Sequence, residues 1–122
     1  MHDVQPLVEA VDELADRFRS LPQSKLLGAV PGYPSRAAAG LALARRLAAL
    51  ALAAEGRPER EFPDAGAFAA GDQLAVAGHD LAAALTALPE GAAVALPGGP
   101  AAAGEVLAGA VAAVRETAGL CA

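Results

Sequence analysis

The residue types that build disulfides, thiolate metal sites and aromatic cores are nearly missing from this sequence. The chain has no tryptophan, one tyrosine, three phenylalanines and one cysteine, Cys121. A single cysteine cannot form an intrachain disulfide and offers no second thiol for a zinc or redox motif. Isoleucine is also absent, and the scarcity of aromatic and β-branched residues argues against a β-sheet fold.

Alanine and leucine fill the chain instead, and both are among the strongest helix formers. With 55% hydrophobic and 19% charged residues, the sequence is too apolar for intrinsic disorder. Its 122 residues correspond to one domain. The heavy use of alanine, glycine, proline and arginine is also typical of a GC-rich bacterial genome. We expect an all-α fold. Because genome composition also favours alanine, the presence of alanine at any one position says little about its role.

The charged residues indicate which kinds of partner the protein can bind. The net charge is −5, and Lys25 is the only lysine. A nucleic-acid-binding surface needs a basic patch that neutralises several phosphates, whereas the only basic cluster here is Arg45-Arg46. These arginines also interrupt the longest apolar stretch, residues 37–54, which a membrane-spanning helix tolerates poorly. The first residues lack the pattern of a signal peptide. We expect a cytoplasmic protein that binds neither nucleic acid nor membrane.

Apolar spacing and turn residues divide the chain into four helical segments. In the first, apolar residues recur at the i, i+3, i+4, i+7 spacing of an amphipathic helix. Ser35 is a favourable N-cap for the second helix. Gly99-Pro100 places proline at the preferred first position of the fourth helix. The predicted helices span about residues 3–21, 35–55, 65–88 and 100–118. These lengths favour a four-helix bundle of antiparallel up-down topology, in a single domain over residues 1–122.

Two of the connections between helices contain large apolar residues, which are expected to be buried against the helices. The first, residues 22–34, is long, and we expect it to fold back over one end of the bundle. Its large apolar residues are Leu26, Leu27, Val30 and Tyr33. In the third, residues 89–99, Val94 and Leu96 are compatible with a short extended piece. The second connection is charged and stiffened by prolines.

The second helix is apolar on two sides. Leu43 and Leu47 share one face, whereas Leu41 and Leu52 fall on nearly the opposite one, with Arg45 beside them. Such a helix is either central in the fold or buried by another chain. Two hypotheses stay open: these leucines and the apolar first connection complete an ordinary core, or they form a self-association or partner surface.

The second hypothesis names specific contact residues. The candidates for the interface are Tyr33, Leu41, Arg45, Leu52 and Phe62. For Phe62 in the charged second connection, the alternative is a hydrophobic staple at the entry to the third helix.

Acidic residues on the first helix are the best candidates for a metal site. Carboxylates at helical spacing can hold Mg²⁺ or Mn²⁺ when they face inward from more than one helix. The residues concerned are Glu9, Asp12, Glu13 and Asp16. Here they lie opposite an apolar stripe, and no Glu-x-x-His motif completes a two-metal site. We therefore expect no cofactor, and keep a metal-dependent enzyme or ligand-binding bundle as the alternative function.

The sequence shows no assembled catalytic set. His79 is the only histidine in the body of the chain, and its neighbour Asp80 points in another direction on a helix. The serines lack a nucleophile-elbow context, and the glycine turn before the fourth helix lacks a Walker lysine. We therefore predict a non-enzymatic helical bundle that acts through contacts with a protein partner or with itself, as a homodimer.

Overall fold

Helices dominate the fold, and a computed structural model describes it for residues 2–122. Helical residues make up 64% of the chain, which confirms the all-α class at this coarse level. The helices are α1 (Gln5–Ser20), α2 (Gln23–Leu26), α3 (Arg36–Ala54), α4 (Ala70–Thr86) and α5 (Ala103–Leu120). A 3₁₀ turn (Ala67–Ala69) precedes α4, and two strands, β1 (Ala93–Leu96) and β2 (Gly99–Ala102), precede α5.

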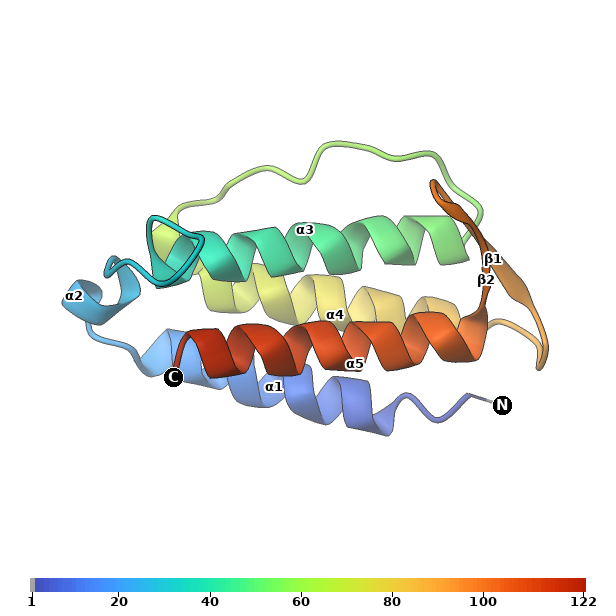
Figure 1. Ribbon diagram of the computed structural model, residues 1–122, viewed down its shortest axis with the longest axis horizontal. Coiled ribbons are helices and arrows are strands. Elements are labelled where there is room, and N and C mark those ends of the chain that lie inside the picture. Colours follow the sequence, from blue (N-terminus) through green and yellow to red (C-terminus); the bar gives the residue numbers. More distant parts are fainter. Residues whose placement is uncertain (1) are drawn as a thin grey trace.

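The four long helices, α1, α3, α4 and α5, lie side by side (Figure 1). α1 and α5 run in one direction, and α3 and α4 run in the other. Near the end of α1, Arg17 donates a 2.9 Å hydrogen bond to the Ala118 carbonyl near the end of α5. Close by, Arg19 pairs with Asp72 at the start of α4 at 2.8 Å. The predicted up-down alternation is therefore wrong between α3 and α4, which are parallel.

The segment between α3 and α4 explains the parallel order. Residues 55–66, which we call the crossing connection, pass along the outside of the helices from one end to the other (Figure 1). Fully extended at about 3.3 Å per residue, a dozen residues reach roughly 40 Å, more than the ~28 Å of a 19-residue helix such as α3. Pro58 and Pro63 keep the backbone out of the helical conformation.

The third helix begins later than the predicted residue 65. Gly66 has a φ angle of 100°, outside the helical region, so the crossing connection is still extended there. α4 begins at Ala70. Glycine at this position allows the chain to turn into α4 from a conformation that other residues rarely adopt.

The first connection folds back over one end of the long helices. Leu26 in α2 and Val30 are buried, and Val30 forms an isolated antiparallel bridge with Tyr33. Ser35 caps α3 as predicted, because the backbone N–H of Ala38 donates to the Ser35 hydroxyl at 3.0 Å.

A β-hairpin covers the opposite end of the helices, beside the start of α1 (Figure 1). Its strands β1 and β2 are antiparallel, and Val94 is only 1% exposed because its side chain enters the core. The predicted start of the fourth helix at Gly99-Pro100 is therefore wrong. Gly99 has a φ angle of 119°, Pro100 continues in an extended strand, and α5 begins at Ala103.

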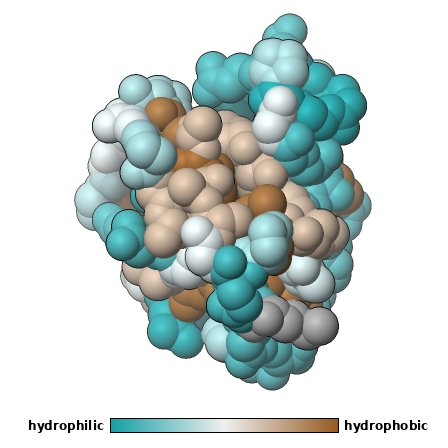
Figure 2. Space-filling view, turned by 90° about the vertical axis from the view of Figure 1, so that its right-hand side faces the viewer, coloured by the Kyte–Doolittle hydropathy of each residue, from teal (hydrophilic) through white to brown (hydrophobic). Residues whose placement is uncertain are grey.

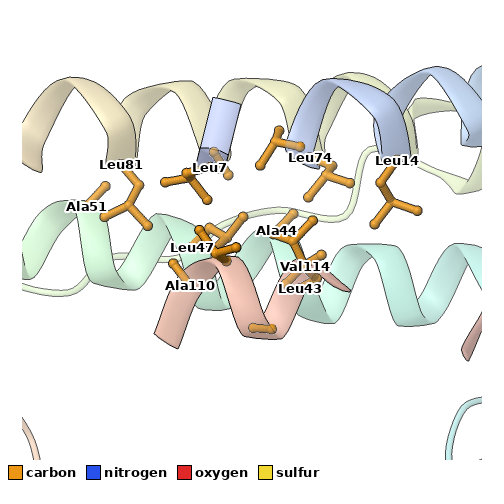
Figure 3. Packing of buried hydrophobic residues seen from close by; sticks show 14 of the residues in the cluster. Leu7, Leu14, Leu43, Ala44, Leu47, Ala51, Leu74, Leu81, Ala110 and Val114 are labelled. Carbon is orange, nitrogen blue, oxygen red and sulfur yellow. The ribbon is translucent and has the colours of Figure 1, made fainter. Parts of the chain in front are cut away.

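The core lies between the four long helices and consists of leucine, alanine and valine side chains (Figure 3). Side chains from all four helices meet there, among them Leu7, Leu14, Leu43, Leu47, Leu74, Leu81, Ala110 and Val114. Within residues 2–122 no polar or charged residue is buried. Burial of apolar surface is therefore the main stabilising contribution.

α3 has the composition of a membrane span as well as of a core helix. Among the helices of residues 2–122 it is the one that is long and apolar enough to cross a membrane. In the fold, 44% of its apolar window is buried against other elements. The core helix of a soluble protein can have the same length and composition.

Candidate functional site

Four of the five predicted interface residues gather on one side of the molecule. Leu41, Arg45 and Leu52 lie on α3 where the crossing connection passes, and Phe62 belongs to that connection. The Arg45 Nε donates to the Phe62 carbonyl at 3.1 Å, while Leu41, Leu52 and Phe62 are half-buried. We call this surface the crossing face. Tyr33 is separate from it and lines a small hollow near the end of α5.

Few hydrogen bonds hold the crossing connection on this face. The Gln73 amide Nε2 donates to the Pro63 carbonyl at 2.6 Å, and its Oε1 accepts from the Ala65 N–H at 3.2 Å. Phe62 packs against the outside of the core. The crossing connection thus partly buries the second apolar side of α3. The apolar character of Leu41 and Leu52 therefore does not require contact with another chain.

Two hollows lie along the crossing connection. One of about 450 Å³ is lined by Leu52 and Phe62, and another of about 480 Å³ by Leu41 and Gln73. Val76 on α4 borders this region and is 58% exposed. The lining combines apolar side chains with arginines and carboxylates that do not converge on one point.

Of the predicted acidic cluster Glu9, Asp12, Glu13 and Asp16, Asp12 is the member that bonds another helix, whereas Glu9 accepts from Gln5 within α1 at 3.1 Å. Oδ1 of Asp12 on α1 accepts a 2.6 Å hydrogen bond from Nε2 of His79 on α4. Asp16 and Asp72 both bind the Arg19 guanidinium, at 2.9 and 2.8 Å. The described part of the chain, residues 2–122, contains no group of three potential ligands that could hold a metal ion. Asp12 and Asp72 therefore link α1 to α4 at the surface, and Asp16 supports Arg19 within α1.

The contact of His79 with Asp12 could not be found from the sequence. The residues stand on helices separated by more than sixty positions, and only the packing of α4 on α1 brings them together. The sequence pointed only to the adjacent Asp80, which is not the partner of His79.

Cys121 lies in a closed corner at the end of α5. It is 2% exposed, and burial raises the pKa of its thiol, although the charges of Arg36 and Arg17 oppose this shift. Arg36 Nε also donates to the Cys121 carbonyl at 3.2 Å. Two arginines from other helices thus bind the last carbonyls of α5, where positive charge is favourable.

We expect Cys121 to react slowly with iodoacetamide in the folded protein. The thiolate is the reactive form, and both burial and the raised pKa reduce its concentration and access. Alkylation followed by mass spectrometry at neutral pH should be at least about tenfold slower than in urea at the same pH. Equal rates in the two conditions would show that the end of α5 is open.

The sequence interpretation overlooked the hairpin end of the molecule, where the structure exposes apolar surface (Figure 2). Residues alternate between the two faces of the hairpin, with Val94 pointing inward. The outer face presents Ala93, Ala95, Pro100 and Ala102, which are all exposed. The available signal was the absence of any charged residue between Glu90 and Glu105.

Comparisons of the chain with protein families, with curated proteins and with solved structures find no match. The molecule presents two exposed apolar surfaces, the crossing face and the hairpin end.

Proposed function

We propose that this protein works by self-association, as a homodimer whose copies meet at the hairpin end, and that it is not an enzyme. The observation that carries the proposal is the exposed apolar surface of the hairpin, formed by a run without charge in a chain of net charge −5. Contiguous exposed apolar surface commonly marks an interface.

Charge favours a second copy as the occupant of this surface. Two identical chains of charge −5 repel one another wherever their acidic surfaces approach within a Debye length, about 8 Å at physiological ionic strength. At the hairpin, alanine and proline side chains would meet their own copies without bringing like charges together. Their small size also permits close approach of the two backbones.

The crossing face is the competing surface for the same function. Its predicted contact residues, Leu41, Arg45 and Leu52, remain candidates, with Phe62 beside them and Tyr33 at a distance. We rank this face second because the crossing connection already covers the apolar side of α3 in part.

We also propose that the scaffold is a four-helix bundle in which the first and fourth long helices run opposite to the second and third. Its support is the apolar core shared by α1, α3, α4 and α5, together with the length of the crossing connection. The bundle would serve to hold the hairpin rigidly at one end.

Charged substitutions distinguish the surfaces. We expect the native protein to be a dimer by native mass spectrometry and sedimentation, and Ala93→Glu/Ala95→Glu to be a monomer, because two carboxylates per copy would meet at the interface. Leu52→Glu should remain dimeric. A matched control is Ala108→Glu/Ala112→Glu, which adds the same charge at exposed positions of α5.

The oligomeric states of these variants can be compared directly if circular dichroism shows that each variant keeps the helicity of the native protein. A native protein that stays monomeric at high micromolar concentration would overturn self-association altogether. Dissociation by Leu52→Glu, with the hairpin variant still dimeric, would move the interface to the crossing face. Dissociation by the α5 control would mean that added charge alone accounts for the effect.

A further inference from the structure

The middle of the crossing connection has no polar contact with the rest of the fold. Residues 58–61 are exposed, and within residues 2–122 they take part in no hydrogen bond or ion pair. The attachments lie on either side of them. The Arg57 N–H donates to the Leu52 carbonyl at 2.9 Å, and the Phe62 carbonyl accepts from Arg45 at 3.1 Å. A stretch of free backbone therefore crosses the outside of the helices.

Space also lies beside this stretch. One hollow of about 450 Å³ is lined by residues 59–62 and by Leu52 of α3. A second, of about 330 Å³, is lined by Arg60, Glu61 and, on α4, Val76. The Arg60–Glu61 peptide is thus not packed onto the helices. Exposed connections with few contacts are the preferred sites of proteolytic cleavage, because an endoprotease must enclose an extended segment of its substrate.

Arg60 is singled out among the basic residues of the chain. Of the nine lysine and arginine residues, all within residues 2–122, Arg57 and Arg60 are the two outside helices. Hydrogen-bonded helical backbone cannot adopt the extended form that an endoprotease binds. Lys25 lies in the short α2, but the next residue, Leu26, is buried. Arg57 precedes Pro58, whose ring hinders enzymes that cleave after arginine.

We propose that Arg60–Glu61 is a proteolytic processing site, hydrolysed in the folded protein by an endoprotease that cleaves after arginine. Water adds across the peptide bond as its C–N bond breaks. The carbonyl carbon of Arg60 takes the oxygen and becomes a carboxylate, and the nitrogen of Glu61 takes the proton and becomes an ammonium group. Glu59 and Glu61 select an enzyme whose cleft accepts acidic residues beside arginine. This inference does not depend on self-association.

The two products would stay together after the cut. One contains α1, α2 and α3, and the other contains α4, the hairpin and α5. Leu74, Leu81 and Leu85 of α4 are 0% exposed in the core to which α1 and α3 also contribute. Burial of this apolar surface does not require a continuous chain. The helices should therefore keep their arrangement.

Hydrolysis would instead release the crossing connection from α3. Phe62 is the apolar residue of this connection that packs against the core, and its carbonyl bond to Arg45 is exposed. Once the chain is cut beside Phe62, the two ends are free to leave the surface. Leu52, which is half-buried under this segment, would then gain exposure. The cut would change the crossing face from covered to open without unfolding the protein.

Digestion of the complete native chain with trypsin, followed by mass spectrometry, tests the site. We expect a single early cut that yields residues 1–60 and 61–122. Arg60→Gln should slow the loss of intact chain at least about a hundredfold, because a folded domain spends less than about a thousandth of its time unfolded. Arg60→Lys should still be cut. The matched control Arg57→Gln, which removes the other arginine of the connection, should be cut at the native rate.

Two outcomes of this digestion would overturn the site. One is a first cut at another basic residue, and the other is an Arg60→Gln variant that is digested as fast as the native chain. Either would show that the middle of the crossing connection is closed to an endoprotease in the folded protein.

The cut protein, with trypsin inhibited after the first cleavage, tests the consequence. Native mass spectrometry should find both fragments together, with the mass of the intact chain plus one water per copy, and circular dichroism should show unchanged helicity. A dye that binds exposed apolar surface should fluoresce more strongly than with trypsin-treated Arg60→Gln. Separation of the fragments or loss of helicity would overturn survival of the fold, and equal fluorescence would overturn opening of the crossing face.

Discussion

Replacement of Leu81 by alanine is expected to lower the free energy of unfolding by about 2–5 kcal/mol. Leu81 is 0% exposed, and Figure 3 shows its side chain pointing from α4 toward Ala51 of α3. Many neighbours in this core are alanines, whose side chains cannot rearrange to fill the space. A domain of this kind has only about 5–15 kcal/mol of stability in total, so the loss would be a large fraction of it.

Urea unfolding followed by circular dichroism measures the loss. Leu27→Ala is the matched control, because Leu27 is 48% exposed and the same atoms are removed from a largely solvated position. Surface substitutions of that kind usually change stability by less than about 0.5 kcal/mol. Equal losses for the two variants would contradict the placement of Leu81 at the centre of the core.

Replacement of Gly78 by alanine should also destabilise the protein, by about 1–3 kcal/mol. A Cβ atom at this position would lie 2.5 and 2.6 Å from the two methyl carbons of Val11 on α1. Val11 is 0% exposed and β-branched, so its side chain has little freedom to move aside. In an exposed helix position the same change would be stabilising, because alanine is the better helix former.

Gly109→Ala serves as the control for this effect. Gly109 lies within α5, is exposed, and has open space where a Cβ would be added, so the substitution should stabilise the protein by about 0.5–1 kcal/mol. Adding Val11→Ala to Gly78→Ala should recover part of the loss, since the two changes exchange volume at one contact. A neutral Gly78→Ala would show that α1 and α4 are not packed so closely.

Glycine explains why α1 and α4 can approach each other. Gly71, one heptad before Gly78, also faces α1, and a Cβ there would lie 2.8 Å from the Ala15 carbonyl oxygen. The surface pairs of Arg19 with Asp72 and of His79 with Asp12 lie along this contact. Two glycines one heptad apart thus determine the separation of the helices, and the ion pairs follow from it.

The sequence by itself determined the helical class and the clearest elements. Alanine and leucine favour helices wherever they occur, and the amphipathic spacing of α1 requires one apolar face to be buried. Leu7, Val11 and Leu14 on that face are indeed 0–1% exposed. Ser35 capped α3 as predicted because capping depends only on residues one turn away. The two-sided apolar character of α3 was likewise visible before any contact was known.

Only the tertiary structure decided the direction of α4, the hairpin before α5 and the partner of His79. Local propensities are the same for a helix that runs up or down, and the direction is chosen by which packing buries more apolar surface between distant residues. Val94 and Leu96 predicted at most a short extended piece, and only four of residues 93–102 are alanines. In the structure this piece pairs with residues 99–102, which were predicted to be the end of the connection and the start of the fourth helix. Burial of Val94 there leaves its neighbours Ala93 and Ala95 facing solvent, because successive residues of a strand point to opposite faces.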